Sequence, residues 1–206
     1  MEKKKNDFIA QGSILAIASI LVRVMGMIYR IPMTAIIGDK GNGFYSYAYS
    51  VYTILLLLSS YSLPLAVSKM VSAKAQLGQW RNVKRVFICA IAFAIGIGTT
   101  FGLIVLIGAQ FFTRVFFHSE LAAIALRFMA PTILIMALLG VFRGFFQGLQ
   151  NTLPTAVSQI VEGLINAIMS VVFAYFLFDF GHGMDAAGGT TDLGYAWGAA
   201  GGDIGT

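Results

Sequence analysis

The sequence is poor in charge. Only 11% of its 206 residues are Asp, Glu, Lys or Arg, whereas 58% are hydrophobic. Soluble globular domains carry about 25% charged residues, so this composition excludes an ordinary water-soluble domain. Several apolar runs exceed the roughly 18–20 residues that a helix needs to cross a bilayer. The sequence therefore predicts an all-α, polytopic membrane helix bundle.

Cysteine and histidine are nearly absent. The single cysteine, Cys89, lies in an apolar run, which excludes an internal disulfide and a cysteine metal site. His118 and His182 have no partners at a spacing typical of metal ligands. The sequence contains no Walker loop, nucleophile elbow or pair of catalytic carboxylates. We therefore expect no metal, no cofactor and no enzymatic activity.

The apolar runs predict five membrane spans and the start of a sixth. The tail MEKKKND and the run after it imitate a signal peptide, but the run continues to Ile37, so we expect a first membrane helix and no cleavage. Pro32 offers a place for this long helix to kink. The sixth span stops 14 residues after it begins, which predicts an N-terminal piece of a longer protein. The expected spans are about 11–37, 44–67, 86–108, 121–142, 153–178 and 193 onward.

The segments between these spans are predicted to be loops. GDKGNG (38–43) and QGLQNTLP (147–154) are typical of turns, and 68–85 is a basic connection. The segment AQFFTRVFFHSE (109–120) is expected to lie at the membrane interface, and DFGHGMDAAGGTTD (179–192) to form a polar loop. The tyrosines of FYSYAYSVY, at the start of the second span, are predicted to lie at the interface, where such rings are enriched.

Lysine and arginine are distributed unequally between alternate loops. Nine lie on the side of the N-terminus: three in the tail, five in 68–85, and Arg143. Two, Lys40 and Arg114, lie on the other side. Because cytoplasmic loops carry the excess of positive charge, this asymmetry predicts a cytoplasmic N-terminus in a bacterial plasma membrane. The basic residues are interpreted as topology signals, so nucleic acid is not an expected partner.

Two arginines interrupt the first span. An arginine at bilayer depth costs about 2.5–3.5 kcal/mol on insertion scales, so it needs a partner, an interface or water. Arg23 lies near the expected midplane, and Arg23, Gly26 and Arg30 share one helix face. Two guanidinium groups beside an open glycine would suit an anion such as a phosphate, because each binds its oxygens in pairs. Snorkelling to an interface and pairing with an acid remain alternatives.

A second polar stripe runs along the fifth span. Its members recur at spacings of three and four residues, so they share a helix face. Glu162 has three interpretations: a charge partner for Arg23 or Arg127, a group that contacts substrate or takes a proton, or a residue that packs at the interface with a missing part of the protein. Together with the two arginines, the stripe supplies the candidate substrate-binding residues Arg23, Arg30, Gln159, Glu162 and Asn166. The stripe consists of Thr155, Gln159, Glu162, Asn166 and Ser170.

Two segments resemble the polysaccharide-exporter branch of the multidrug/oligosaccharidyl-lipid/polysaccharide exporter superfamily. They are GDKGNGFYSYAYSVYTILLLLSSYSLPLAVSKMVSAKAQLG (38–78) and RGFFQGLQNTLPTAVSQIVEGLINAI (143–168). This branch includes stage V sporulation protein B-type proteins and is related to MurJ-type lipid II flippases. The resemblance implies two six-helix bundles that face each other across a cavity, of which this chain is the N-terminal one. It also implies alternating access that carries a lipid-linked sugar outward.

The resemblance extends to individual residues. Arg23, followed by Val24, Met25 and Gly26, is similar to the arginine that opens the MurJ-type R-V-L-G motif, which implies a role in substrate handling. Arg30 lies one position from the second MurJ-type arginine but fits the sporulation-type pattern. Glu162 is similar to the acid of the sporulation-type SQ..E pattern. A further MurJ-type arginine has no counterpart within TILLLLSSYSL (53–63). This difference disfavours lipid II as the specific substrate.

Three functions stay open from the sequence. The first is a flippase for a lipid-linked oligosaccharide or cell-wall precursor, which would need a second bundle as partner. The second is a cation-coupled multidrug exporter of the same superfamily, for which a buried carboxylate such as Glu162 is suited but two arginines are not. The third is an inactive membrane scaffold fragment.

Overall fold

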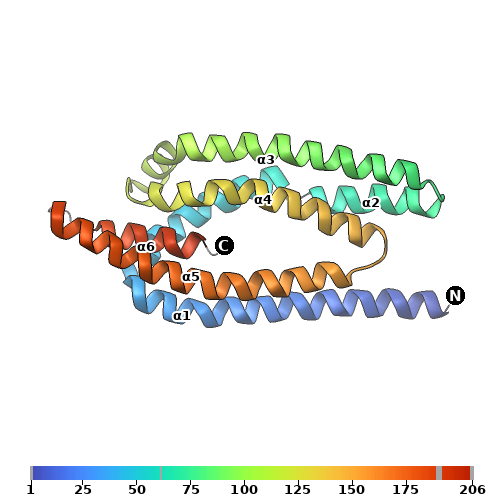
Figure 1. Cartoon of the computed structure of the whole chain (residues 1–206), viewed down its shortest axis with the longest axis horizontal. Coiled ribbons are helices and arrows are strands. Elements are labelled where there is room, and N and C mark those ends of the chain that lie inside the picture. Colours follow the sequence, from blue (N-terminus) through green and yellow to red (C-terminus); the bar gives the residue numbers. More distant parts are fainter. Residues whose placement is uncertain (1, 61, 189–191, 205–206) are drawn as a thin grey trace.

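The computed structural model describes residues 2–60, 62–188 and 192–204, and the described residues are helical with no strand. Four stretches within them are long and apolar enough to cross a membrane: Gly12–Gln76, Trp80–Phe117, Ala122–Gly148 and Leu153–Ala186. The protein is therefore an all-α polytopic membrane helix bundle (Figure 1). Its helices are α1 (Glu2–Ser60), α2 (Leu63–Gln76), α3 (Trp80–Phe117), α4 (Ala122–Gly148), α5 (Leu153–Gly188) and α6 (Leu193–Ile204).

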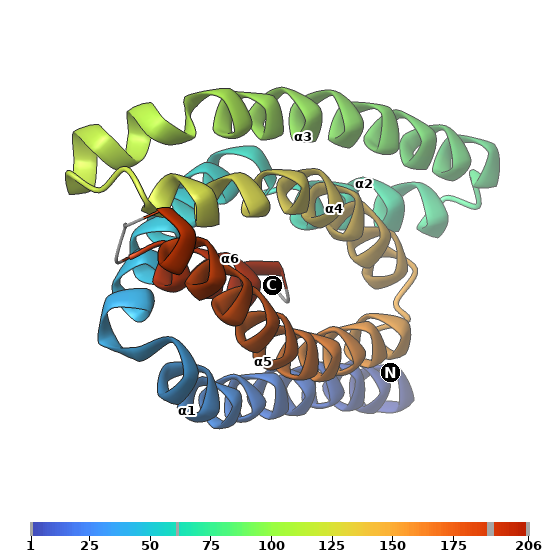
Figure 2. The ribbon, with the colours of Figure 1, turned by 60° about the vertical axis from the view of Figure 1, so that its left-hand side comes forward.

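The first predicted turn is reduced to a single residue. Instead of a turn over 38–43, α1 bends at Gly38, whose φ of 63° and ψ of −175° lie outside the helical region. Only glycine adopts this combination at low cost, because it has no Cβ. The helix continues through Pro32, so the non-helical residue is the glycine and not the proline. The two halves of α1 consequently run in different directions (Figure 2).

The predicted second span is divided in two. The second half of α1 ends at Ser60, and α2 begins at Leu63, with Pro64 in its first turn. Proline has no N–H to donate to the carbonyl of residue 60, and its ring clashes with that carbonyl, so a continuous helix is disfavoured there. Proline thus separates the part of the span that packs in the centre of the bundle from the part that leads to the basic connection.

Three predicted loops are largely helical. The basic segment 68–85 continues α2 to Gln76 and starts α3 at Trp80, and 109–120 is helical as far as Phe117. The segment 179–192 continues α5 to Gly188, and its residues 189–191 lie outside the described part. A helix satisfies its own backbone hydrogen bonds, so it extends beyond the apolar window that identifies it. At 38 residues, α3 is about 57 Å long, well above a hydrocarbon core of about 30 Å.

The helices form two groups that diverge toward the N-terminus (Figure 2). One group contains α2, α3 and α4; the other contains the first half of α1 with α5 and α6. The groups meet at the end where α1 bends, and the largest core lies there. A second, smaller core joins α2, α3 and α4. The larger core includes Met33, Ile37, Tyr45, Val105, Leu126, Met129 and Ile133, and the smaller one Leu63, Val67, Val71, Val83 and Val141.

Small residues allow close packing between α2 and α4. A Cβ added at Gly144 would lie 2.5 Å from the carbonyl oxygen of Pro64 and 2.9 Å from its Cα. These are backbone atoms, so the contact cannot be relieved by moving a flexible side chain. The absence of a Cβ at this position therefore sets the distance between the two helices, as small residues do in other membrane bundles.

We predict that Gly144→Ala lowers the thermal stability of the purified protein, because overpacking of this kind costs about 1–3 kcal/mol. The matched control is Gly96→Ala in α3, where an added Cβ meets nothing within 4 Å. Alanine favours a helix over glycine by about 1 kcal/mol, so the control is expected to unfold at the same or a higher temperature. Thermal unfolding in one detergent compares the two variants, and equal unfolding temperatures would contradict the close packing.

Candidate polar site between helices α1, α5 and α6

Glu162 is paired with Arg143, across the two helix groups. The Arg143 guanidinium on α4 forms a salt bridge with the Glu162 carboxylate on α5, and its Nε donates to Ser158 Oγ at 3.2 Å. Both side chains are partly buried, at 17% and 34% exposure. Glu162 is thus a charge partner, as one of its three interpretations held, but the prediction that it pairs with Arg23 or Arg127 is wrong. The sequence contained an indication of this partner. Arg143 and Glu162 lie within three helical turns of the connection between α4 and α5, on either side of it, so the two helices bring them close together.

The rest of the polar stripe on α5 divides into two parts. Ser170 Oγ lies 2.9 Å from the carbonyl oxygen of Gly202 on α6 and 3.0 Å from Asn166 Oδ1, so this end of the stripe holds α6. At the other end, Thr155 Oγ1 and Gln159 Oε1 are buried without a hydrogen-bond partner among the described residues. Buried polar atoms of this kind are rare in native proteins and call for an explanation. Gln159 and Thr155 therefore have unused hydrogen-bonding capacity.

Arg23 and Arg30 lie on an exposed flank of α1. The helix packs on α5 through Val22 and Met25, which lie within 3.2–3.3 Å of the position of a Cβ at Gly163. The arginines are on a neighbouring face, and their spacing of seven positions places them on the same side of the helix. In the described part of the chain, neither guanidinium has an ion-pair partner. A Cβ added at Gly26, between them, would meet nothing within 4 Å, so the flank is open.

Tyrosines from both halves of α1 surround Arg30. Its guanidinium carbon lies 5.8 Å from the centroid of the Tyr45 ring, within the range of a cation–π interaction. Tyr29 hydrogen-bonds to Tyr45 across the bend of the helix. Tyr45 and Tyr52 are buried, so these two rings pack against protein inside the bundle, and their position at the membrane interface stays a prediction. The bend at Gly38 folds the second half of α1 inward and carries both rings into the bundle.

Asp203 is a site residue that the sequence did not identify. Its side chain, on α6, is fully buried, and neither carboxylate oxygen has a hydrogen-bond partner in the ranges that the structure describes. Tyr52 lies close enough to both Asp203 and Glu162 to interact electrostatically with them, and its hydroxyl also has no described partner. The one available signal was a lone acid within the Gly- and Ala-rich helix LGYAWGAAGGDI.

The arrangement has groups that can bind an anion. Two open guanidinium groups supply donors for an anion, whereas the oxygens of Gln159, Tyr52 and Asp203 without hydrogen-bond partners are buried inside the bundle. Within the described residues, no group of three His, Cys, Asp or Glu side chains is placed to hold a metal ion.

We predict a favourable coupling between Arg143 and Glu162. The single changes Arg143→Ala and Glu162→Ala each leave a partly buried charge without its partner, whereas the double change removes both charges. The double variant should therefore lose less stability than the two single losses combined, by about 0.5–3 kcal/mol. Chemical unfolding of the four proteins measures this difference. Strictly additive losses would show that the pair does not couple α4 to α5.

Comparisons with known proteins identify relatives of this chain. Over 198 residues the chain is 26% identical to the lipid II flippase MurJ of Bacillus subtilis (strain 168), a match over 92% of this chain and 36% of the relative. It is also 26% identical to stage V sporulation protein B of the same organism over 184 residues, covering 89% of the chain and 36% of the relative. The chain thus spans about a third of the length of these relatives. No solved structure matches it.

The family assignment rests on most of the chain. The model of the family described as "Polysaccharide biosynthesis protein" matches residues 8–187, which include α2–α4 and nearly all of α1 and α5. This range contains Arg23, Arg30 and the whole polar stripe of α5, whereas Asp203 lies beyond it. The chain belongs to the polysaccharide biosynthesis protein family.

Proposed function

We propose that this chain forms part of a flippase that moves a polyprenyl-diphosphate-linked sugar across the bacterial plasma membrane, for polysaccharide or peptidoglycan synthesis. The observation that carries the proposal is the pair of arginines without ionic partners on one open flank of α1, within the described residues. In hydrocarbon such charges are costly, whereas in a water-filled cavity they are available to an anion. The name of one matched relative, a lipid II flippase, supports this class of transporter.

The proposed mechanism assigns a role to each part of the site. The polyprenyl tail stays in the lipid while the diphosphate and the sugar cross. Arg23 and Arg30 bind the diphosphate, and Gln159 and Asn166 on α5 exchange hydrogen bonds with sugar hydroxyls. Glu162 holds α4 against α5 through Arg143 and so positions the stripe without binding the sugar directly.

Alternating access requires a second body. We propose that a second bundle faces this one and that substrate binds between them near the midplane, as in other secondary transporters. The excess of Lys and Arg on the N-terminal side of the membrane supports a cytoplasmic N-terminus as part of this proposal. Movement of the two bundles then exposes the arginines first to one side and then to the other.

A cation-coupled multidrug exporter is the second candidate. Glu162, the carboxylate that the sequence offered to a cationic drug, is already paired with Arg143. Asp203 favours this candidate instead, since it is a buried carboxylate without a described partner. The two arginines disfavour it, because they repel organic cations.

We predict that Arg23→Ala in the natural gene prevents rescue of a strain depleted of its lipid II flippase. Losing one charge-assisted contact, worth about 1.5–3 kcal/mol, would weaken binding about 10- to 150-fold. Arg23→Lys should rescue in part, because an ammonium keeps the charge but lacks the bidentate fork. Arg114→Ala is the matched control, since this arginine is exposed and pairs with Glu120 at the surface. Normal growth with Arg23→Ala, at equal membrane levels of protein, would contradict the anion site.

A further inference from the structure

A cavity of about 630 Å³ opens between α2 and α3, on the opposite helix group from the polar site. None of its lining residues belongs to the site between α1, α5 and α6. The walls come from two antiparallel helices, so residues 63–74 of α2 run alongside residues 82–93 of α3, over about 16 Å. The lining consists of Leu63, Ala66, Val67, Met70, Lys74, Asn82, Arg85, Val86, Cys89, Ala90 and Phe93.

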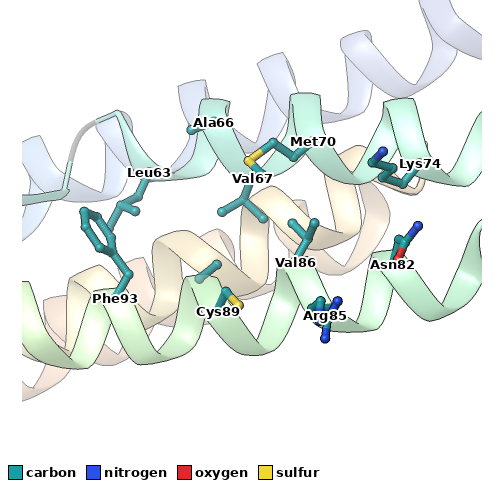
Figure 3. Close-up of a pocket in the computed structure, with 11 residues that line it drawn as sticks. Leu63, Ala66, Val67, Met70, Lys74, Asn82, Arg85, Val86, Cys89 and Phe93 are labelled. Carbon is teal, nitrogen blue, oxygen red and sulfur yellow. The ribbon is translucent and has the colours of Figure 1, made fainter.

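The cavity is cationic at one end and apolar along the rest. Lys74 and Asn82 lie at the end near the connection between the helices, with Arg85 less than one turn further along α3 (Figure 3). Leu63 and Phe93 lie at the opposite end (Figure 3). No acidic side chain lines the cavity, and Lys74 and Arg85 have no ion-pair partner within the described part. The cationic end therefore has charge available for an anion.

The apolar part of the cavity is exposed on the outside of this helix group. Met70 and Phe93 are each 54% exposed, and Ile88 and Trp80 on the same helix as Phe93 are also exposed. Side chains of this kind at membrane depth are in contact with lipid. Trp80 lies at the start of α3, next to the cationic end, and tryptophan is enriched at the level of the lipid headgroups. The cavity thus matches a lipid molecule along its length, because its cationic end suits the headgroup and its apolar part suits an acyl chain.

We propose that this cavity is a binding site for an anionic phospholipid. The phosphate lies between Lys74 and Arg85, Asn82 hydrogen-bonds to the headgroup, and an acyl chain follows Val67, Met70 and Val86 toward Phe93. Basic pockets between membrane helices on the cytoplasmic side bind anionic headgroups in this way. The choice of an anionic over a zwitterionic lipid rests on charge complementarity, because two cations face the headgroup and no acid lines the cavity to pair with a choline. The site is independent of the proposed transport function.

Cys89 allows a direct test, because it is the single cysteine of the chain, is exposed and lines the cavity. The rate of its alkylation by N-ethylmaleimide is measured on the full protein in detergent, with phosphatidylglycerol, phosphatidylcholine or inorganic phosphate added. Phosphatidylglycerol is expected to slow alkylation at least several-fold, at a lower mole fraction than phosphatidylcholine, and phosphate alone is expected to have no effect. Native mass spectrometry counts the phosphatidylglycerol molecules that stay bound.

Two double variants that lose the same charge distinguish a specific lipid-binding site from nonspecific electrostatic attraction of an anionic lipid. Lys74→Gln with Arg85→Gln should abolish the preference for phosphatidylglycerol in both measurements. Lys69→Gln with Arg81→Gln, which removes two nearby cations outside the lining, should preserve it. Equal protection by both lipids, equal loss in both variants, or protection by phosphate alone would overturn the proposal. Unreactive Cys89 without any added lipid would also overturn it, since a protein segment would then cover the cavity. Equal unfolding temperatures confirm that the variants remain folded.

Discussion

A polar side chain inside a membrane must have a partner or water, because hydrocarbon offers neither, and the arrangement of this bundle follows from that constraint. The charge of Glu162 is met by Arg143, and the hydroxyl of Ser170 is met by Asn166 and by the backbone of α6. The first of these pairings joins α4 to α5, and the second joins α5 to α6. The interactions that make polar residues tolerable in the bundle are therefore also those that hold its parts together.

The polar side chains left without partners mark the part of the molecule that can bind a ligand. Arg23 and Arg30 have no ionic partner within the described residues, and Gln159, Tyr52 and Asp203 retain buried oxygens without hydrogen bonds. These residues come from α1, α5 and α6, which pack against one another. A water-filled interior gives all of them a common explanation, whereas a dry interior would impose a separate energetic cost on each one.

Much of the fold follows from the sequence, since long apolar runs identify membrane helices without any knowledge of packing. The starts of α5 and α6, at Leu153 and Leu193, coincide with the predicted starts of the corresponding spans. Helix ends are harder to predict, because a helix continues into polar sequence as long as its backbone can be satisfied internally. The basic segment 68–85 and the Gly-rich segment after Asp179 are largely helical for this reason. Pro64 is a local signal that was available and that explains the division of the second span.

The site was predicted only in part. Helical spacing identified the stripe on α5, because periodicity along one helix is visible in the sequence. The partner of Glu162, the inward position of Tyr45 and Tyr52, and the burial of Asp203 depend on how helices lie against one another. The bend at Gly38 carries the two tyrosines inward, and no count of apolar residues reveals the direction of a bend. Arg143 was interpreted as a topology signal because it lies near a helix end, although its side chain reaches across to α5.

The most direct test of a hydrated interior is the reactivity of a cysteine at position 26, measured with a charged, membrane-impermeant thiol reagent in a Cys89→Ser background. Gly26 lies between the two arginines, and an added Cβ meets nothing there within 4 Å, so the substitution should not disturb packing. Ile107→Cys on α3 is the control, since Ile107 is 80% exposed on a helix in contact with lipid. Labelling of Gly26→Cys together with protection of Ile107→Cys is the predicted result. If both cysteines are protected in the intact, membrane-embedded protein, the arginines do not face water and the account is contradicted.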